Sequence, residues 1–262
     1  MSLTGTYTRL LVRGLLAGLL AGLLAGGVAF VVGEPQVEAA VALENSVAEP
    51  HSHGESDSGG VATADHHDDE PLVSRTGQRA GLFLATTLAG VALGAIFATV
   101  AYGIRRAVPV SAVTLSLGLA GAAWLAVVMV PYVKYPPNPP AVGDPETFGQ
   151  RTWLWLAAVA IGLLAVVVAA YVATASAKRL EPVARIAATA LAFLVVAVVG
   201  CVLLPSVNEV TDGFPATLLW EFRLSTLATQ TTLWASLGLV FAYLSDRSAR
   251  PPVREAAPMS AM

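Results

Sequence analysis

The stretch Leu10–Val32 reads LLVRGLLAGLLAGLLAGGVAFVV and carries no charge after Arg13. As a helix rising about 1.5 Å per residue, it is long enough to cross the hydrocarbon core of a bilayer. It is apolar on every face rather than along one stripe, which excludes the surface helix of a soluble protein. Its uncharged part also exceeds the roughly 7–15 residues of a secretory signal core. We therefore predict a retained transmembrane helix.

Five further segments have the same character: Gly81–Ile104, Ala107–Val130, Trp153–Ala177, Ile186–Leu204 and Leu224–Leu244. The composition agrees, with 55 % hydrophobic and 13 % charged residues, against about 25 % charged in a soluble domain. The prediction is an all-α, polytopic membrane helix bundle of about six spans, with the lipid bilayer as its surroundings. The net charge of −3 gives no indication of nucleic-acid binding.

The chain divides into four predicted parts: a Gly-rich first helix (1–32), an outer loop that is partly disordered (33–79), a five-helix bundle (80–245) and a disordered tail (246–262). The second and third spans should form a tight hairpin at Arg105-Arg106, with Pro109 in the first turn of the third span. A faint repeat pairs this hairpin with the one at Lys178-Arg179, 73 residues later. Duplication and chance similarity among apolar segments both explain it.

Positive charge predicts the orientation in the membrane. With the N-terminus in the cytoplasm, ten of the fifteen Lys and Arg residues lie inside, as the positive-inside rule requires. Fifteen of the eighteen Asp and Glu residues then lie outside. We predict a bacterial inner-membrane protein with both termini cytoplasmic and an acidic outer face that attracts cations.

Four glycines of the first span share one helix face at strict four-residue spacing: Gly14, Gly18, Gly22 and Gly26. Such a groove lets a neighbouring helix approach closely. The neighbour is a helix of the same chain, a second subunit or a second copy of the chain, and packing within the chain is the simplest of the three.

All four histidines fall in the outer loop, which is rich in Gly, Ser, Asp and Glu: His51, His53, His66 and His67. Imidazole and carboxylate groups together suit Co²⁺, Ni²⁺, Zn²⁺ or Cu²⁺. We predict loose metal capture by this loop, and a solvated acidic linker is the alternative.

Three spans are followed at their outer ends by proline-containing segments that carry side chains with oxygen donors. The sixth span is predicted to begin beside these segments. The candidate outer metal site consists of Glu34, Asn138, Asn208, Glu209 and Glu221. The sixth span adds a polar face at three- and four-residue steps, with Arg223, Thr226 and Gln230 as a candidate translocation path. The alternative for the outer site is that these are ordinary loop residues without a ligand. The alternative for the polar face is hydrogen bonding between helices.

Several islands in matching order resemble the CbtA family of predicted cobalt transporter subunits, bacterial proteins linked to cobalamin supply. They are Gly33-Glu34-Pro35, Asn138-Pro139-Pro140 through Gly143-Asp144-Pro145-Glu146-Thr147, Asn208-Glu209-Val210, and Phe214-Pro215 through Leu218-Leu219-Trp220-Glu221-Phe222-Arg223. The resemblance implies movement of Co²⁺ as cargo, with no permanent cofactor, and a small single-span partner subunit. It supplies no catalytic residues.

The sequence thus favours a non-enzymatic component of divalent metal uptake. The phosphate-binding Gly-rich motif ending in Gly-Lys-Ser or Gly-Lys-Thr is absent, so the chain should not hydrolyse ATP itself. The rival hypothesis is a non-transporting membrane scaffold or metal-sensing subunit. A membrane enzyme acting on lipid or an envelope precursor is a weaker third hypothesis, with Glu209, Glu221 and Arg223 as its only candidate groups.

Overall fold

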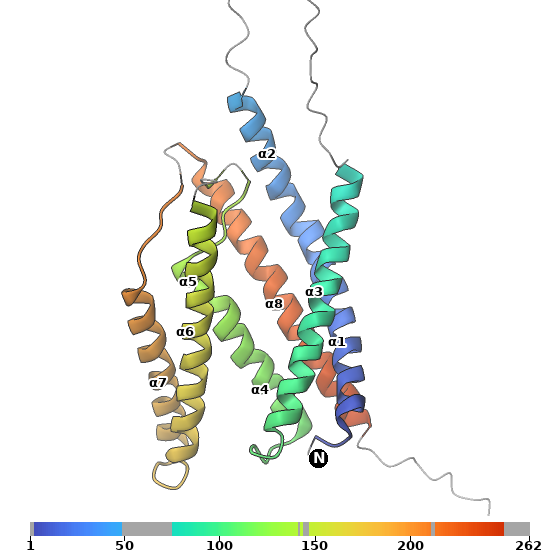
Figure 1. The fold of residues 1–262 in the computed structure, drawn as a ribbon, viewed down its shortest axis with the longest axis vertical. Coiled ribbons are helices and arrows are strands. Elements are labelled where there is room, and N and C mark those ends of the chain that lie inside the picture. The colour runs from blue at the N-terminus through green and yellow to red at the C-terminus, as the bar shows by residue number, and fades with distance from the viewer. Residues whose placement is uncertain (1–2, 49–74, 141, 144–146, 211–212, 249–262) are drawn as a thin grey trace, which may run out of the picture.

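The computed structural model describes residues 3–48, 75–140, 142–143, 147–210 and 213–248, and its regular structure there is entirely helical (Figure 1). The elements are α1 (Tyr7–Val28), the π-helical turn η1 (Ala29–Gly33), α2 (Glu34–Ala48), α3 (Arg75–Ile104), α4 (Ala112–Trp124), the π-helical turn η2 (Leu125–Met129), α5 (Val130–Lys134), α6 (Phe148–Ala175), α7 (Pro182–Leu203) and α8 (Ala216–Arg247). Six helical stretches are long and apolar enough to cross a membrane: Tyr7–Ser46, Arg75–Ile104, Ala112–Lys134, Gly149–Ala175, Pro182–Leu203 and Ala216–Arg247. The predicted all-α bundle of six spans is confirmed.

The first helix continues past Val32, where the sequence predicted a boundary. Pro35 has no N–H to donate to the carbonyl four residues before it. The helix accommodates this through η1, in which the Glu34 N–H bonds to Ala29, five residues back. The same arrangement recurs in the third span, where the Val130 N–H bonds to Leu125 one residue before Pro131. Each proline is thus accommodated by a single wider, π-helical turn, and neither helix ends there.

The third span begins at Ala112, not near Ala107 as predicted. Ser111 is its N-cap, and its hydroxyl accepts a 3.0 Å hydrogen bond from the Thr114 N–H. Pro109 therefore lies in the preceding link rather than in the first turn. The capping serine sets the boundary because it satisfies an N–H that has no helical partner.

Helix packing differs from the tight hairpin predicted at Arg105-Arg106. The main neighbour of α3 is α1, whereas that of α4 is α8, so α3 and α4 have little contact with each other. The other hairpin is closed, because α6 and α7 pack along their length. The two units of the suggested repeat therefore do not share one packing arrangement.

The glycine face of α1 packs against α3 of the same chain. A Cβ at Gly18 would lie 2.8 Å from the Gly90 carbonyl carbon, and one at Gly90 would lie 2.8 Å from the Gly22 Cα. Both helices therefore need glycine where they cross. The two helix backbones therefore lie in direct contact. This contact stabilises the pair in place of interlocking side chains.

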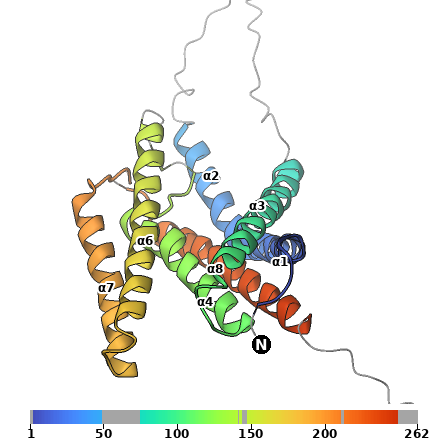
Figure 2. The same ribbon diagram turned by 60° about the horizontal axis from the view of Figure 1, so that its bottom comes forward.

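The central helix is α8, which packs against α1 on one side and α4 on the other. Phe241 of α8 is fully buried and meets Phe97 of α3 edge-on, with 5.2 Å between ring centroids. Figure 2 shows the α6–α7 pair standing apart from α1 and α3, with α4 and α8 between them. The outer face of α7 is widely exposed, with Val202 and Leu203 more than three-quarters exposed, as expected for a lipid-facing helix.

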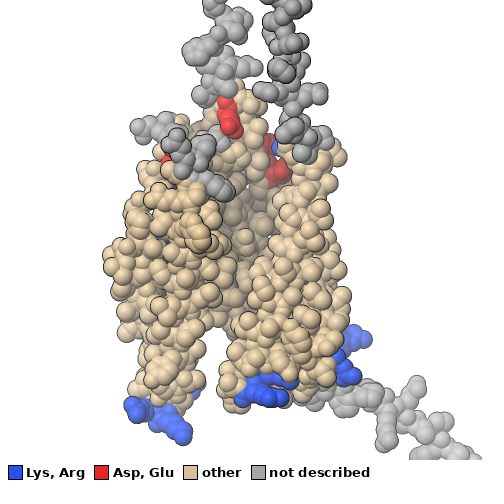
Figure 3. Space-filling model, viewed as in Figure 1, with Lys and Arg blue, Asp and Glu red and all other residues tan. Residues whose placement is uncertain are grey.

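Charge is segregated along the bundle. In Figure 3 most of the visible Lys and Arg side chains gather at the end that holds the α3–α4 and α6–α7 links, and the visible acidic side chains lie at the other end. The links carry Arg105, Arg106, Lys178 and Arg179. This distribution is what the positive-inside rule describes, and the direction of the bundle across a cell membrane stays a prediction.

Candidate functional site

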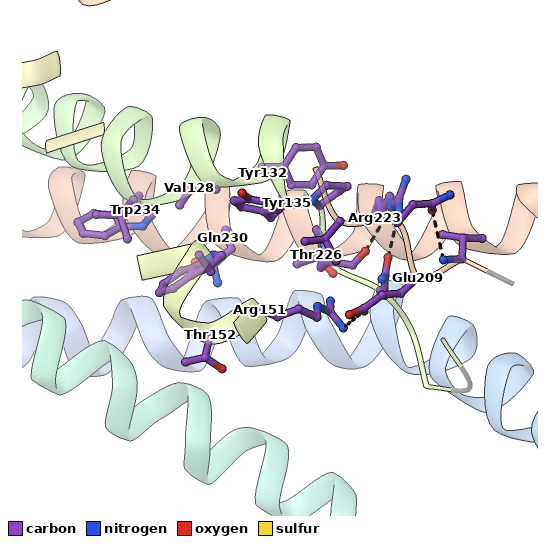
Figure 4. A pocket seen from close by; sticks show the side chains of 18 of the residues that line it. Val128, Tyr132, Tyr135, Arg151, Thr152, Glu209, Arg223, Thr226, Gln230 and Trp234 are labelled. Carbon is purple, nitrogen blue, oxygen red and sulfur yellow. Dashed lines mark hydrogen bonds and ion pairs between the residues drawn. The ribbon is translucent and has the colours of Figure 1, made fainter. Parts of the chain in front are cut away.

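A cavity of about 680 Å³ lies between the two halves of the molecule (Figure 4). Its walls come from α3, η2, α5, α6, α8 and the two segments that precede α6 and α8. In Figure 3 the visible face is hollowed between the two sides of the bundle. The cavity exists because α6 packs on α7, α5 and η2 but makes no substantial contact with α8.

Six of the residues singled out in the sequence line this one cavity: Asn138, Asn208, Glu209, Arg223, Thr226 and Gln230. Three of them come from the predicted outer metal site and three from the predicted path. The structure therefore joins most of these two groups into one site.

Among the described residues that line the cavity, Glu209 is the only acidic one. Its carboxylate lies 2.6 Å from the Arg151 guanidinium and accepts a hydrogen bond from the Thr147 hydroxyl at 2.5 Å. Its side chain is only 7 % exposed. Buried pairing of this kind holds a carboxylate in its charged form and in one position.

Arg223 lies seven residues into α8 and reaches the segment that leaves α5. Its guanidinium donates to the Asn138 side-chain oxygen at 3.0 Å and to the Pro137 carbonyl at 3.3 Å. Nearby, the Tyr135 hydroxyl donates to the Pro205 carbonyl at 2.7 Å, and burial raises the pKa of this phenol, so it stays a donor. These bonds tie the segments after α5 and α7 to the top of α8.

The inner part of the cavity is aromatic and amide-bearing. Gln230 and Trp234 of α8 face Trp155 of α6, and the Thr226 hydroxyl bonds back to its own helix at Phe222. The Tyr132 hydroxyl is buried and has no hydrogen-bond partner in the described part of the chain. In Figure 4 it points toward the end of the cavity where Arg223 lies. Oxygen and nitrogen groups therefore continue along α8 beyond the charged mouth.

Glu34 lies outside this cavity. It forms ion pairs with Arg75 at 3.1 Å and Arg79 at 3.3 Å, and Glu38 pairs with the same two arginines. Because the helix continues through Pro35, Glu34 faces the start of α3 instead of the segments that meet at α8. Glu221 is exposed on α8 and does not line the cavity. The five residues of the predicted outer site thus occupy three separate places.

The four candidate capture residues His51, His53, His66 and His67 lie outside the described residues. Within the described ranges, no three His, Cys, Asp or Glu side chains gather closely enough to hold a metal ion. From the described lining, a metal ion in the cavity could bind Glu209 and the amides of Asn138 and Asn208, with water or other molecules at its remaining positions. Amide and carboxylate oxygens suit a six-coordinate, partly hydrated ion better than a tetrahedral zinc site.

Sequence reasoning missed Arg151, Tyr132 and Trp155 as parts of the site. In the sequence, Arg151 is only a positive charge just before the predicted span Trp153–Ala177, and Trp155 is only one aromatic residue within that span. No spacing links them to Glu209, which lies 58 positions after Arg151 in the sequence. Their role depends on how α6 packs, which the sequence pattern does not encode.

Comparison with known proteins adds one positive finding. The family model described as probable cobalt transporter subunit (CbtA) matches residues 7–246. No curated protein and no solved structure matches the chain. Since the family match covers nearly all of the 262 residues, this chain belongs to the family of probable cobalt transporter subunits (CbtA).

Proposed function

We propose that the chain admits cobalt through the cavity lined by Glu209, Asn138 and Arg223, as the multi-pass component of an uptake system. The acidic outer loop and its histidines gather the metal. The polar side of α8, with Thr226 and Gln230, then passes it inward. The family supports a cobalt transporter subunit, and the route and direction are our proposal.

One observation carries this proposal: the one carboxylate of the described lining, Glu209, stands at the charged end of the cavity, and the polar side of α8 continues from there toward Gln230. Oxygen and nitrogen groups inside a membrane bundle mark a pathway more often than a lipid-facing surface. The candidate path of Arg223, Thr226 and Gln230 borders the same space as Glu209. A cargo held at Glu209 is therefore already at the entrance to the path.

The membrane potential supplies a driving force that needs no ATP. Moving one charge inward across an inside-negative membrane is favourable by about 2.3 kcal/mol per 100 mV, hence about 4.6 kcal/mol for a divalent ion. This energy favours accumulation only if the site releases its cargo inward. Glu209 alone binds more weakly than a closed multi-carboxylate cage, which is compatible with release.

A subunit needs a partner, and we propose a small single-span protein or a second copy of the chain in that role. The glycine face of α1 is already filled by α3. A partner helix would therefore lie on another lipid-facing surface. The cargo ion is a substrate rather than a bound cofactor, and the proposed role requires no catalytic step.

The test is uptake of radioactive ⁵⁷Co by cells that make the chain with its genetic neighbours. Glu209→Gln keeps the size of the side chain and removes its charge, so the apparent affinity for cobalt should fall roughly tenfold or more. Glu181→Gln, at the opposite end of the bundle, is the matched control and should leave uptake unchanged. Both proteins must be present in the membrane at equal levels. Equal cobalt dependence in the two variants would leave the non-transporting scaffold or metal sensor as the better hypothesis.

A further inference from the structure

The described lining of the cavity carries net positive charge. Its charged groups are Arg151, Glu209 and Arg223, which sum to +1. Arg151 and Glu209 neutralise each other at 2.6 Å. Arg223 forms no ion pair with any described residue, and both of its hydrogen-bond acceptors are neutral oxygens.

Arg223 thus stands near the N-terminal end of the membrane-spanning helix α8 without an anionic partner among the described residues, an arrangement that is costly unless it has a function. Arg223 is half-buried on α8 and faces the cavity rather than open solvent. Charged groups within spans pair with an opposite charge or serve a ligand. The Tyr132 hydroxyl, buried and unpartnered in the described structure, adds a second donor to the same cavity. This pair of donors suits an oxyanion, and arginine binds carboxylates particularly well through its planar fork.

The size and walls of the cavity also suit an organic ligand. Its volume of about 680 Å³ lies within the range of small-molecule sites, about 300–1,000 Å³. An ion with six waters needs only roughly 180 Å³, at about 30 Å³ per water. Trp155 and Trp234 supply aromatic walls, which a hydrated ion does not require.

We propose that cobalt enters this cavity as an anionic chelate, with the ion held by a small polycarboxylate and Arg223 binding one of its carboxylates. This inference rests on the proposed function for the identity of the metal. A bare Co²⁺ would raise the charge of the described lining and its cargo from +1 to +3, whereas a Co²⁺ complex with a tricarboxylate carries −1 and brings the sum to zero. Glu209 and the amide of Asn138 or Asn208 then occupy positions that the chelator leaves open on the ion.

Direct binding tests the ligand class apart from transport. The purified full chain in phosphatidylcholine nanodiscs is titrated with CoCl₂, with citrate and with their 1:1 complex. We expect the complex to bind at least tenfold more tightly than CoCl₂. Arg223→Gln should weaken complex binding roughly tenfold to a hundredfold, because it removes a charge-assisted hydrogen bond. The matched control is Arg185→Gln, an exposed arginine of α7, which should change nothing.

Further variants keep the test decisive if Arg223→Gln does not fold. Arg223→Lys retains the charge and loses the fork, and Tyr132→Phe removes only a hydroxyl, so each should weaken binding of the complex several-fold. Equal affinity for CoCl₂ and the complex overturns the inference, as does unchanged affinity in all three variants. Loss of chelate binding in phosphatidylglycerol nanodiscs also overturns it, since the oxyanion site would then belong to a lipid headgroup.

Uptake of ⁵⁷Co separates this inference from the proposed function. Binding of the complex that depends on Arg223, without any ⁵⁷Co uptake, supports the ligand assignment and refutes the transport role. Uptake from free Co²⁺ that citrate does not increase, and that Arg223→Gln does not reduce, refutes the chelate and leaves transport standing.

Discussion

Alanine at Gly18 tests the contact on which the N-terminal half of the bundle depends. A Cβ there would lie 2.8 Å from the Gly90 carbonyl carbon and 3.1 Å from the Gly94 Cα. Carbon atoms in good contact are about 3.5–4.0 Å apart. Because both clashing atoms belong to the backbone of α3, no side chain can turn aside. The two helices must separate by roughly 1 Å over the crossing.

The expected loss of stability follows from that separation. Overpacking a close contact costs typically about 1–3 kcal/mol, and alanine returns about 0.5–1 kcal/mol through its better helix propensity. A net destabilisation of about 1–2 kcal/mol remains. Gly27 is the matched control, since it lies on the same helix and its added Cβ would meet nothing within 4 Å. Gly27→Ala should be neutral or stabilising.

Thermal unfolding of the purified proteins in one detergent measures the difference. For a chain of about this size, 1 kcal/mol shifts the midpoint by roughly 2–4 °C. Gly18→Ala should therefore unfold roughly 2–8 °C below the wild type, with Gly27→Ala at or above it. Equal midpoints for the two variants would refute the close crossing of α1 and α3. Unchanged midpoints with loss of a co-purifying subunit would show that the glycine face serves a partner instead.

Three other predictions concern orientation, capture and the ion-paired glutamate. In a Cys201→Ala background, cysteines at Ser58 and Asn138 should react with an impermeant thiol reagent in intact cells and one at Arg106 should not; the opposite pattern would invert the topology. Changing all four loop histidines to alanine should reduce ⁵⁷Co uptake at scarce metal and matter little at abundant metal, whereas loss at every concentration would place them in the passage. Glu34→Gln should lower the unfolding midpoint by a few degrees without changing cobalt affinity, because its carboxylate pairs with arginines, and an affinity change alone would contradict this.

The sequence predicts the six spans well because each needs only about 20 apolar residues in a row. It also points to six residues that the structure places around one cavity. Prolines after the third and fifth spans indicate the segments that carry Asn138 and Glu209. Polar residues spaced three and four apart indicate the side of the sixth span that lines the cavity. Each of these signals depends on residues close together in the sequence, so it can be recognised without knowing how the helices pack.

The misplaced residues depend on backbone register and on long-range packing. Whether Pro35 ends a helix or sits behind a π-helical turn decides which way Glu34 faces, and both outcomes fit the same sequence. The partners of the candidate ligands are also non-local, as with Arg151 and Glu209 on different elements. Counting charges along the chain predicts an excess of acids outside, but not that the Arg151 guanidinium already holds the Glu209 carboxylate.

This pairing changes what metal binding at the site requires. Arg151 holds one carboxylate oxygen of Glu209, and Arg223 holds the side-chain oxygen of Asn138, so a bare ion that binds either of these oxygens must displace a guanidinium. Every displaced guanidinium then lies beside a new positive charge. A polycarboxylate chelate supplies acceptors to which the same arginines can turn, and so the number of charge-assisted hydrogen bonds is conserved. Entry by exchange of partners is therefore less costly than entry by a bare ion, and it makes the arginines part of cargo recognition.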